Sequence, residues 1–442
     1  MWEWLPQLFF LSFCENQAAK LINKIIFTQI FYNMPKTEFK VYGIRWMMLI
    51  VYMVMVAVNQ LLWITFAPIT GDATKYYGVS DLWIGILSMC FMIVYIVVSI
   101  PASWIIDKYG IRIGVGIGAV FTGVFGLVRG FAGTNYNLLL IAQIGIAIGQ
   151  PFILNAITKL AARWFPMDER ATAAGLGTLA MYLGILLGMT LTPYLIIGSG
   201  IGGMLYIYGI ISILTTVAFL VLFKEGPPTA PCLPDQEERS LVYDGFKQTL
   251  RTKDFILLMV IFFIGLGVFN AVTTWIEDIL RPRGFSATQA GITGGLMIVG
   301  GIIGALFIPI LSDRYKKRIP FIIIALTGAT IGLTGITFAT SYWLLLTSGV
   351  VLGFFLLSSG PIGFQYGAEI TYPASEGTSN GMLLLMGQIS GIAFIFGMDS
   401  LKSHITGSMT KSLIFLIALM VLSILISFRL KESIMLSGQD DK

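Results

Sequence analysis

Twelve long apolar stretches are the feature that most limits how this chain can fold. Each is long enough to cross the ~30 Å hydrocarbon core of a bilayer as a helix. Hydrophobic residues make up 56% of the chain, charged residues only 12%, and the mean hydropathy is +0.84. A water-soluble globule of this composition would expose far too much hydrocarbon to water. The sequence therefore predicts an all-α integral membrane protein of a cell membrane, plasma or cytoplasmic, with spans near 44–69, 82–106, 112–132, 137–163, 170–197, 202–223, 255–280, 288–311, 319–339, 342–366, 377–398 and 411–429.

A short charged motif occurs once in each half of the chain. DKYGIR begins at Asp107 and DRYKKR begins at Asp313, 206 residues later. The segments RWFPMDERATAAG from Arg163 and EITYPASEGTSNG from Glu369 repeat at the same offset. A duplicated six-helix unit explains both pairs and is common in secondary transporters. We expect two pseudo-symmetric bundles at 44–223 and 255–430, a cytoplasmic linker at 224–254, and cytoplasmic ends at 1–43 and 431–442.

The distribution of lysine and arginine predicts the orientation of the chain. These residues favour the loops that hold the two motifs, and such loops stay cytoplasmic. Arg129, Arg281 and Lys402 are expected in loops on the other side. The net charge of +5 follows from this topology, so we expect no nucleic-acid partner, and the chain is expected to act as a monomer in the bilayer. Residues 1–33 are either an interfacial segment or a misassigned start before Met34.

The repeated motif predicts a conformational latch on the cytoplasmic face. Asp107 and Asp313 are expected to accept hydrogen bonds from the start of the following helix and to face cations, in bonds that break when the halves rock. Glu169 and Glu376 begin helices, where they either stabilise the helix dipole or pair with the motif of the same half. The expected latch residues are Asp107, Lys108, Arg112, Glu169, Arg170, Asp313, Arg314, Arg318 and Glu376.

Polar side chains are scarce within the predicted spans, and their cost in a membrane suggests a use. Each is either a helix-to-helix hydrogen bond or a contact to substrate. Carboxylates fall near helix ends, and the single histidine, His404, lies in a loop, so we expect facilitated diffusion without tight proton coupling. Cysteine spacing indicates neither metal nor disulfide, and no cofactor is expected. The candidate substrate-binding residues are Asn59, Trp63, Gln143, Gln150, Asn270, Trp275 and Gln388.

Glycines cluster within two predicted spans, at 114–118 and 291–304. Small residues let membrane helices approach closely. The clusters indicate either tight packing within a bundle or the moving contact between the two bundles.

The two-copy motif resembles the hallmark of the major facilitator superfamily. More narrowly, RWMMLIVYMVMVAVNQLLWITFAP from Arg45, WFPMDERATA from Trp164 and EITYPASEGTSNGMLLLMGQISGI from Glu369 resemble solute carrier family 49, the feline leukaemia virus subgroup C receptor-related proteins. The resemblance implies an alternating-access carrier, with choline, ethanolamine, haem or a vitamin B6 form as cargo in different members. It also implies that Trp63 is a cation-binding aromatic and that Gln143 and Gln388 bind substrate.

One position departs from the choline-handling members of that family. Where they carry tyrosine after phenylalanine, this chain has Asn270 after Phe269, which removes half of a two-aromatic cage. The leading prediction is a transporter of a choline-like or ethanolamine-like amine. The alternatives are an exporter of haem, porphyrin or another amphipathic metabolite, and a receptor or sensor that keeps the fold without transport. An enzyme is not expected, because no nucleophile motif or paired carboxylates occur at one depth.

Overall fold

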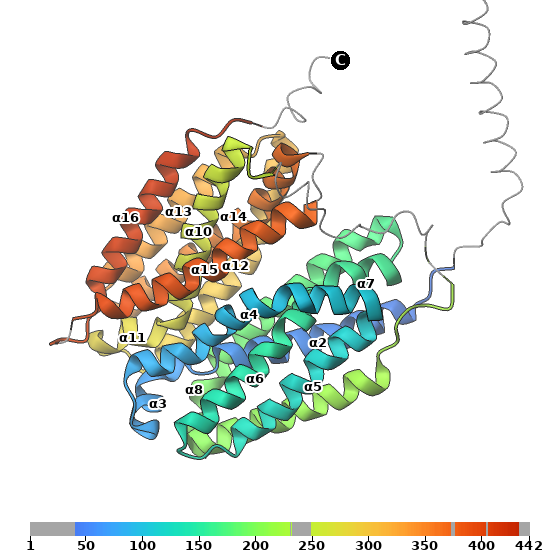
Figure 1. Cartoon of the computed structure of the whole chain (residues 1–442). Coiled ribbons are helices and arrows are strands. Elements are labelled where there is room, and N and C mark those ends of the chain that lie inside the picture. Colours follow the sequence, from blue (N-terminus) through green and yellow to red (C-terminus); the bar gives the residue numbers. More distant parts are fainter. Residues whose placement is uncertain (1–39, 230, 232–248, 373–375, 404, 433–442) are drawn as a thin grey trace, which may run out of the picture.

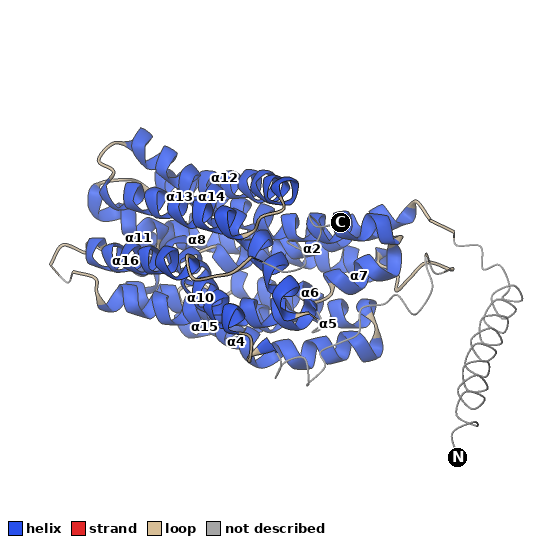
Figure 2. Ribbon diagram, turned by 90° about the horizontal axis from the view of Figure 1, so that it is seen from above, coloured by secondary structure: helices blue, strands red, loops and turns tan. Residues whose placement is uncertain are grey.

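The computed structural model describes residues 40–229, 231, 249–372, 376–403 and 405–432. Within these ranges the chain is built from helices joined by short loops, without a strand (Figure 2). The expected segment at 1–33, most of the linker, His404 and the far C-terminus lie outside the described residues. The first half comprises α2 (Ile44–Ile64), η1 (Ala67–Ile69), α3 (Thr70–Tyr77), α4 (Asp81–Tyr109), α5 (Ile111–Gly130), α6 (Tyr136–Leu154), α7 (Ile157–Trp164) and α8 (Met167–Leu222).

The second half repeats this plan. It comprises α10 (Lys253–Thr274), α11 (Ile276–Leu280), η3 (Arg281–Arg283), α12 (Ala287–Tyr315), α13 (Ile319–Phe338), α14 (Tyr342–Thr371), α15 (Glu376–Ser400) and α16 (Thr410–Ser427).

Eleven helices in the described chain are long and apolar enough to span a membrane. Helix α8 contains two of the predicted spans, because Gly200 adopts φ +66° and ψ 177° between them. Positive φ is easy only for glycine, so this residue lets the chain leave one helix and begin the next without a longer loop. The predicted set of twelve spans is therefore confirmed, with boundaries that differ by a few residues.

The packing of the helices confirms the duplication. In the first half α2 packs on α8, α5 on α8 and α6, and α4 on α6. In the second half the corresponding helices make the corresponding contacts: α10 on α15, α13 on α16 and α14, and α12 on α14. The two halves meet where α8 contacts α12 and α4 contacts α15 (Figure 1). A site between the halves is thus bordered by helices from both.

Polar contacts between the halves gather at the end of the molecule that holds α3 and α11, at the lower left of Figure 1. We call this the joined end. There the Gly71 amide N–H donates to Glu277, and Asp81 pairs with Arg281 and Lys402. The opposite end holds α7 and the loops of the repeated motif.

The two glycine clusters have different roles. Gly291 and Gly295 face α8 of the other half, where added Cβ atoms would lie 2.4 Å from the Met189 carbonyl oxygen and 2.5 Å from the Thr190 methyl carbon. Gly300 instead packs on α14 within its own half. Glycines of 114–118, such as Gly118, also pack within their half. Of the two clusters, only the glycines at the start of α12 therefore face the other half.

Candidate functional site

Trp63 and Asn270 occupy equivalent positions of the duplicated unit, 207 residues apart, one in each half. The Trp63 indole Nε1–H donates to the Ser88 carbonyl of α4 at 3.1 Å. Asn270 Nδ2 donates to the Gly387 carbonyl of α15 at 3.1 Å. Helices α4 and α15 form one of the two helix pairs described above that touch between the halves. Each side chain is therefore held in place beside the contact of the two bundles.

Helix ends explain how these side chains are placed. Helix α2 ends at Ile64, directly after Trp63, and the chain continues through η1, where Pro68 lies within the turn. Helix α10 ends at Thr274, directly before Trp275. Such breaks free backbone carbonyls at membrane depth, which is tolerated where the backbone is buried in protein or lines a cavity.

The structure holds Asn270 against α15 at the residue that precedes Gln388 in the chain. Asn270 bonds the carbonyl of the residue directly before Gln388, and both side chains are half-buried. A Cβ added at Gly391 would lie 2.9 Å from Asn270 Nδ2 and 2.5 Å from Met92 Sδ of α4. Asn270 therefore lies beside a point where the two halves touch.

Trp275 crosses the boundary between the halves. Its indole is fully buried, and Nε1 donates to the Ile395 carbonyl at 3.2 Å. Its ring packs against Gly85 of α4, where a Cβ would lie 2.7 Å from the ring atoms. Trp275 thus closes the space between α4 and α15 on the side of the joined end.

Asn59 and Gln143 point into the first half instead. Asn59 Nδ2 donates to Thr122 Oγ1 at 3.1 Å, and Gln143 Nε2 donates to the Leu62 and Leu87 carbonyls at 3.3 and 3.2 Å. Both side chains are fully buried. In this conformation their hydrogen bonds tie helices together. Gln150 is buried on α6 at 7% exposure.

Arg129 is a residue that sequence reasoning misplaced. It was expected in a loop, but it is fully buried in the last turn of α5. Its guanidinium donates to the Leu62 carbonyl and Gln143 Oε1 at 2.9 Å each and to Thr65 Oγ1 at 3.3 Å. These acceptors flank Trp63, so Arg129 supports the break in α2. Its position inside an apolar stretch was the available signal.

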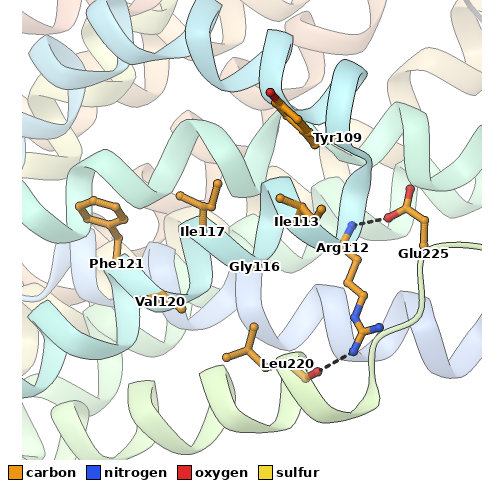
Figure 3. Close-up of a pocket in the computed structure, with 9 residues that line it drawn as sticks. All are labelled: Tyr109, Arg112, Ile113, Gly116, Ile117, Val120, Phe121, Leu220 and Glu225. Atoms are coloured by element: carbon orange, nitrogen blue, oxygen red, sulfur yellow. Dashed lines mark hydrogen bonds between the residues drawn. The ribbon is translucent and has the colours of Figure 1, made fainter.

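The prediction that Asp107 and Asp313 accept hydrogen bonds from the start of the following helix is wrong. Helix α5 begins with the Ile111 and Arg112 N–H groups, and Glu225 accepts both, at 3.0 and 2.7 Å. Figure 3 shows the bond from Arg112. Helix α13 is capped in the same way by Glu432, which accepts from the Arg318 and Ile319 N–H groups. In each half, a glutamate that follows the last helix accepts the hydrogen bonds that were expected for Asp107 and Asp313. Glu225 and Glu432 are themselves 207 residues apart, a repeat that was visible in the sequence.

The charged latch residues have partners in their own halves. Asp107 pairs with Lys159 at 3.3 Å, and Arg318 pairs with Asp313 and with Glu369 at 2.9 Å. Lys108 lies over the Trp104 ring, Arg170 bonds the Ala162 and Phe165 carbonyls, and Arg314 is exposed.

Glu169 does not pair with the motif of its half. It forms a two-fold contact with Arg45, at 2.9 and 3.0 Å, and Glu369 instead contacts the motif in the second half. The side chain of Glu376 lies outside the described residues.

A pocket with a cavity volume of about 710 Å³ lies beside the capped start of α5 (Figure 3). Its lining comes from the end of α4, from α5 and from the end of α8, so it belongs to the first half alone. It is therefore distinct from the predicted substrate site between the halves. The lining residues are Tyr109, Arg112, Ile113, Gly116, Ile117, Val120, Phe121, Leu220 and Glu225.

A second group of charges, also outside the predicted site, lies at the joined end. Asp81, Glu277 and Asp278 surround the cations Arg281 and Lys402. Burial raises the pKa of Glu277 to about 7, although Arg281 acts in the opposite direction. Burial lowers the pKa of Lys402, but the neighbouring Asp278 and Asp81 carboxylates outweigh it and the net change is a rise. The sequence indicates that Glu277 and Asp278 lie near the end of a predicted span, but it does not indicate their contact with the other half.

The sequence model of the Major Facilitator Superfamily matches residues 48–395. A protein named solute carrier family 49 member A3, from Xenopus tropicalis, is 31% identical over 86% of this chain and 82% of its own. A choline/ethanolamine transporter, flvcr2b of Danio rerio, is 29% identical over 82% of this chain and 79% of its own.

Two solved structures share the fold. A bacterial homologue of the human lysosomal transporter spinster, in an inward-facing and unoccupied conformation, superposes with a TM-score of 0.71 at 15% identity, over 88% of this chain and 97% of that one. A D-xylose-proton symporter gives a TM-score of 0.69 at 16% identity, over 87% and 98%.

Proposed function

Because this chain belongs to the Major Facilitator Superfamily and, within it, to solute carrier family 49, it is a multi-pass membrane transporter, and we propose that its cargo is a small organic amine of the choline or ethanolamine type. The halves rock about a site between them, which opens alternately to either side. The proposal rests on Trp63 and Asn270, which the duplication places at equivalent positions beside the contact of the halves.

The chemistry of these two side chains suits an ammonium ion. An indole face attracts a cation by about 0.5–2 kcal/mol, more where water is excluded. The hydrogen bond to Ser88 fixes the orientation of Trp63, which lowers the entropy lost on binding. Asn270 uses Nδ2 for Gly387, so its Oδ1 remains as the acceptor for an N–H or O–H group of the ligand. We propose Gln388, which follows Gly387 on α15, as a further amide of the site.

The other predicted substrate contacts have a supporting part in this proposal. Asn59 and Gln143 fix the helices around Trp63, and Trp275 covers the site on the side of the joined end. The latch also remains a proposal: the pairs of Asp107 and Arg318 exchange partners when the opposite end closes. A monomer contains both halves of the proposed site, which supports transport without a second copy.

Uptake into proteoliposomes tests the proposal. The purified protein should take up labelled choline or ethanolamine with saturation, and Trp63→Ala should raise KM by about 2- to 30-fold, the loss expected for one cation–π contact. Trp343→Ala is the matched control, because Trp343 is 78% exposed. If the inserted protein takes up neither compound, the amine proposal is wrong. If Trp63→Ala transports like Trp343→Ala, the site is wrong.

A further inference from the structure

The charged group at the joined end has more carboxylates than cations. Arg281 Nη2 contacts Asp278 and lies 3.1 Å from Asp81, while Lys402 Nζ contacts Asp81 and lies 2.8 Å from Asp278. These two carboxylates and two cations form a balanced set. Glu277 is the additional carboxylate, and in the described chain its ion pair is with Arg281 Nη1 at 3.2 Å.

Glu277 is buried because the two halves meet. Its residue is 5% exposed, and its Oε2 accepts the Gly71 N–H of the other half at 3.0 Å. A Cβ at Gly71 would lie 2.3 Å from Arg281 Nη1 and 3.1 Å from Glu277 Oε1, so a larger residue there would displace these side chains. Separation of the joined end removes the Gly71 contact and returns water to the carboxylate.

We propose that Glu277 is a proton-sensitive switch, which is protonated when the joined end is closed and ionised when that end opens. An excess carboxylate in a closed, poorly hydrated contact is stabilised by taking up a proton. The proton enters and leaves when the same end is open, so it biases the conformation without crossing the membrane. The switch therefore agrees with facilitated transport and does not depend on the identity of the cargo.

The charges that face Glu277 act in both directions. Its own segment contributes Asp278 and Arg281, α3 of the other half contributes Asp72, and behind them Asp81 and Lys402 belong to the balanced set. Burial has the largest effect and raises the pKa of Glu277, and the nearby Asp278 and Asp72 carboxylates raise it further. Arg281 and the Gly71 N–H lower it, and the net result is a pKa of about 7.

The direction of the pH effect follows from this rise. A glutamate in water ionises near pH 4.3. The closed form therefore binds the proton more tightly than the open form, and protonation favours the closed form below about pH 7. This preference is lost as the pH rises through that value.

Spin-label distances across the joined end test the switch in lipid nanodiscs without any substrate. Ser80→Cys and Ile405→Cys, in a background without the native cysteines, place one label on each half at exposed positions. On acidification from pH 8 to pH 6, the ratio of closed to open populations should rise about tenfold, as expected for one proton bound near pH 7. Glu277→Gln, which is neutral at every pH, should stay at the acidic ratio throughout.

Two further variants complete the test. Asp168→Asn neutralises an exposed carboxylate at the opposite end and should keep the tenfold change. Gly71→Ala should lower the closed population at both pH values by separating Glu277 from the other half. An unchanged pH response in Glu277→Gln, or a parent protein without any response, would overturn the proposal. Infrared loss of the protonated carboxyl band in Glu277→Gln gives an independent readout.

Discussion

At the scale of single residues, Asn270 is the position that distinguishes this chain. It is the counterpart of Trp63 in the second half, yet it offers a carbonyl oxygen where an aromatic ring would offer a π face. A quaternary ammonium has no N–H to donate, whereas a primary ammonium has three. A hydrogen bond from the ammonium group to Asn270 Oδ1 therefore favours a primary amine over choline.

Replacement of Asn270 should change this preference. In Asn270→Leu, kcat/KM for ethanolamine should fall by about 2- to 12-fold relative to that for choline, since one hydrogen bond contributes about 0.5–1.5 kcal/mol. Asn270→Tyr should favour choline by providing an aromatic face in the second half. Competition between the two labelled compounds in proteoliposomes measures the ratio. An identical ratio in all three proteins would show that Asn270 does not contact the cargo.

At the scale of helices, the two halves use the same device to begin their third helix. Glu225 accepts two N–H groups at the start of α5, and Glu432 accepts two at the start of α13. Helix starts leave N–H groups without partners inside the helix and carry partial positive charge, so a carboxylate there is stabilising. Because each glutamate follows the last helix of its half, each bond also closes its six-helix bundle.

Loss of these caps should destabilise each bundle separately. Glu225→Ala and Glu432→Ala should each lower the free energy of unfolding by about 0.5–2 kcal/mol, and Glu225→Gln by less, because an amide retains one acceptor oxygen. The two alanine effects should add, since the sites lie in different halves. Thermal unfolding in detergent measures this. A double variant no less stable than either single one would contradict independent capping.

At the scale of the whole molecule, closure of the joined end combines charge pairs with close packing. The pairs of Asp81 with Arg281 and Lys402 join the halves at the surface, while Gly291 lets α12 approach α8 beneath them. Contacts that exist in only one conformation change the equilibrium between conformations, whereas contacts within a half change its stability.

Alanine substitutions at two glycines of α12 should distinguish an effect on the conformational equilibrium from an effect on stability. Gly291→Ala should decrease the closed population in the spin-label experiment, because its Cβ would lie 2.4 Å from the Met189 carbonyl oxygen across the interface. Gly300→Ala should instead lower thermal stability, because its Cβ would lie 2.5 Å from the Val350 carbonyl oxygen within the same half. Equal effects of both variants on the closed population would contradict this division.

The fold can be predicted from the sequence alone. The lengths of the apolar stretches predict the spans, since a helix needs about 20 apolar residues to cross a bilayer. The offset of about 206 residues between the repeated motifs predicts two equivalent bundles, and the packing of the helices confirms them. These properties are local or periodic, so they can be read along the chain without knowledge of which helices touch.

In contrast, which polar side chains meet can be read only from the packing of the helices. Asn59, Gln143 and Asn270 look alike in the sequence, but the first two bond within one half and the third lies at the contact of the two. Arg129 and Glu277 lie near helix ends, where sequence alone predicts exposure to water. Their burial depends on neighbours far away in the chain, because the orientation of each helix is set by its packing against others and not by its own residues.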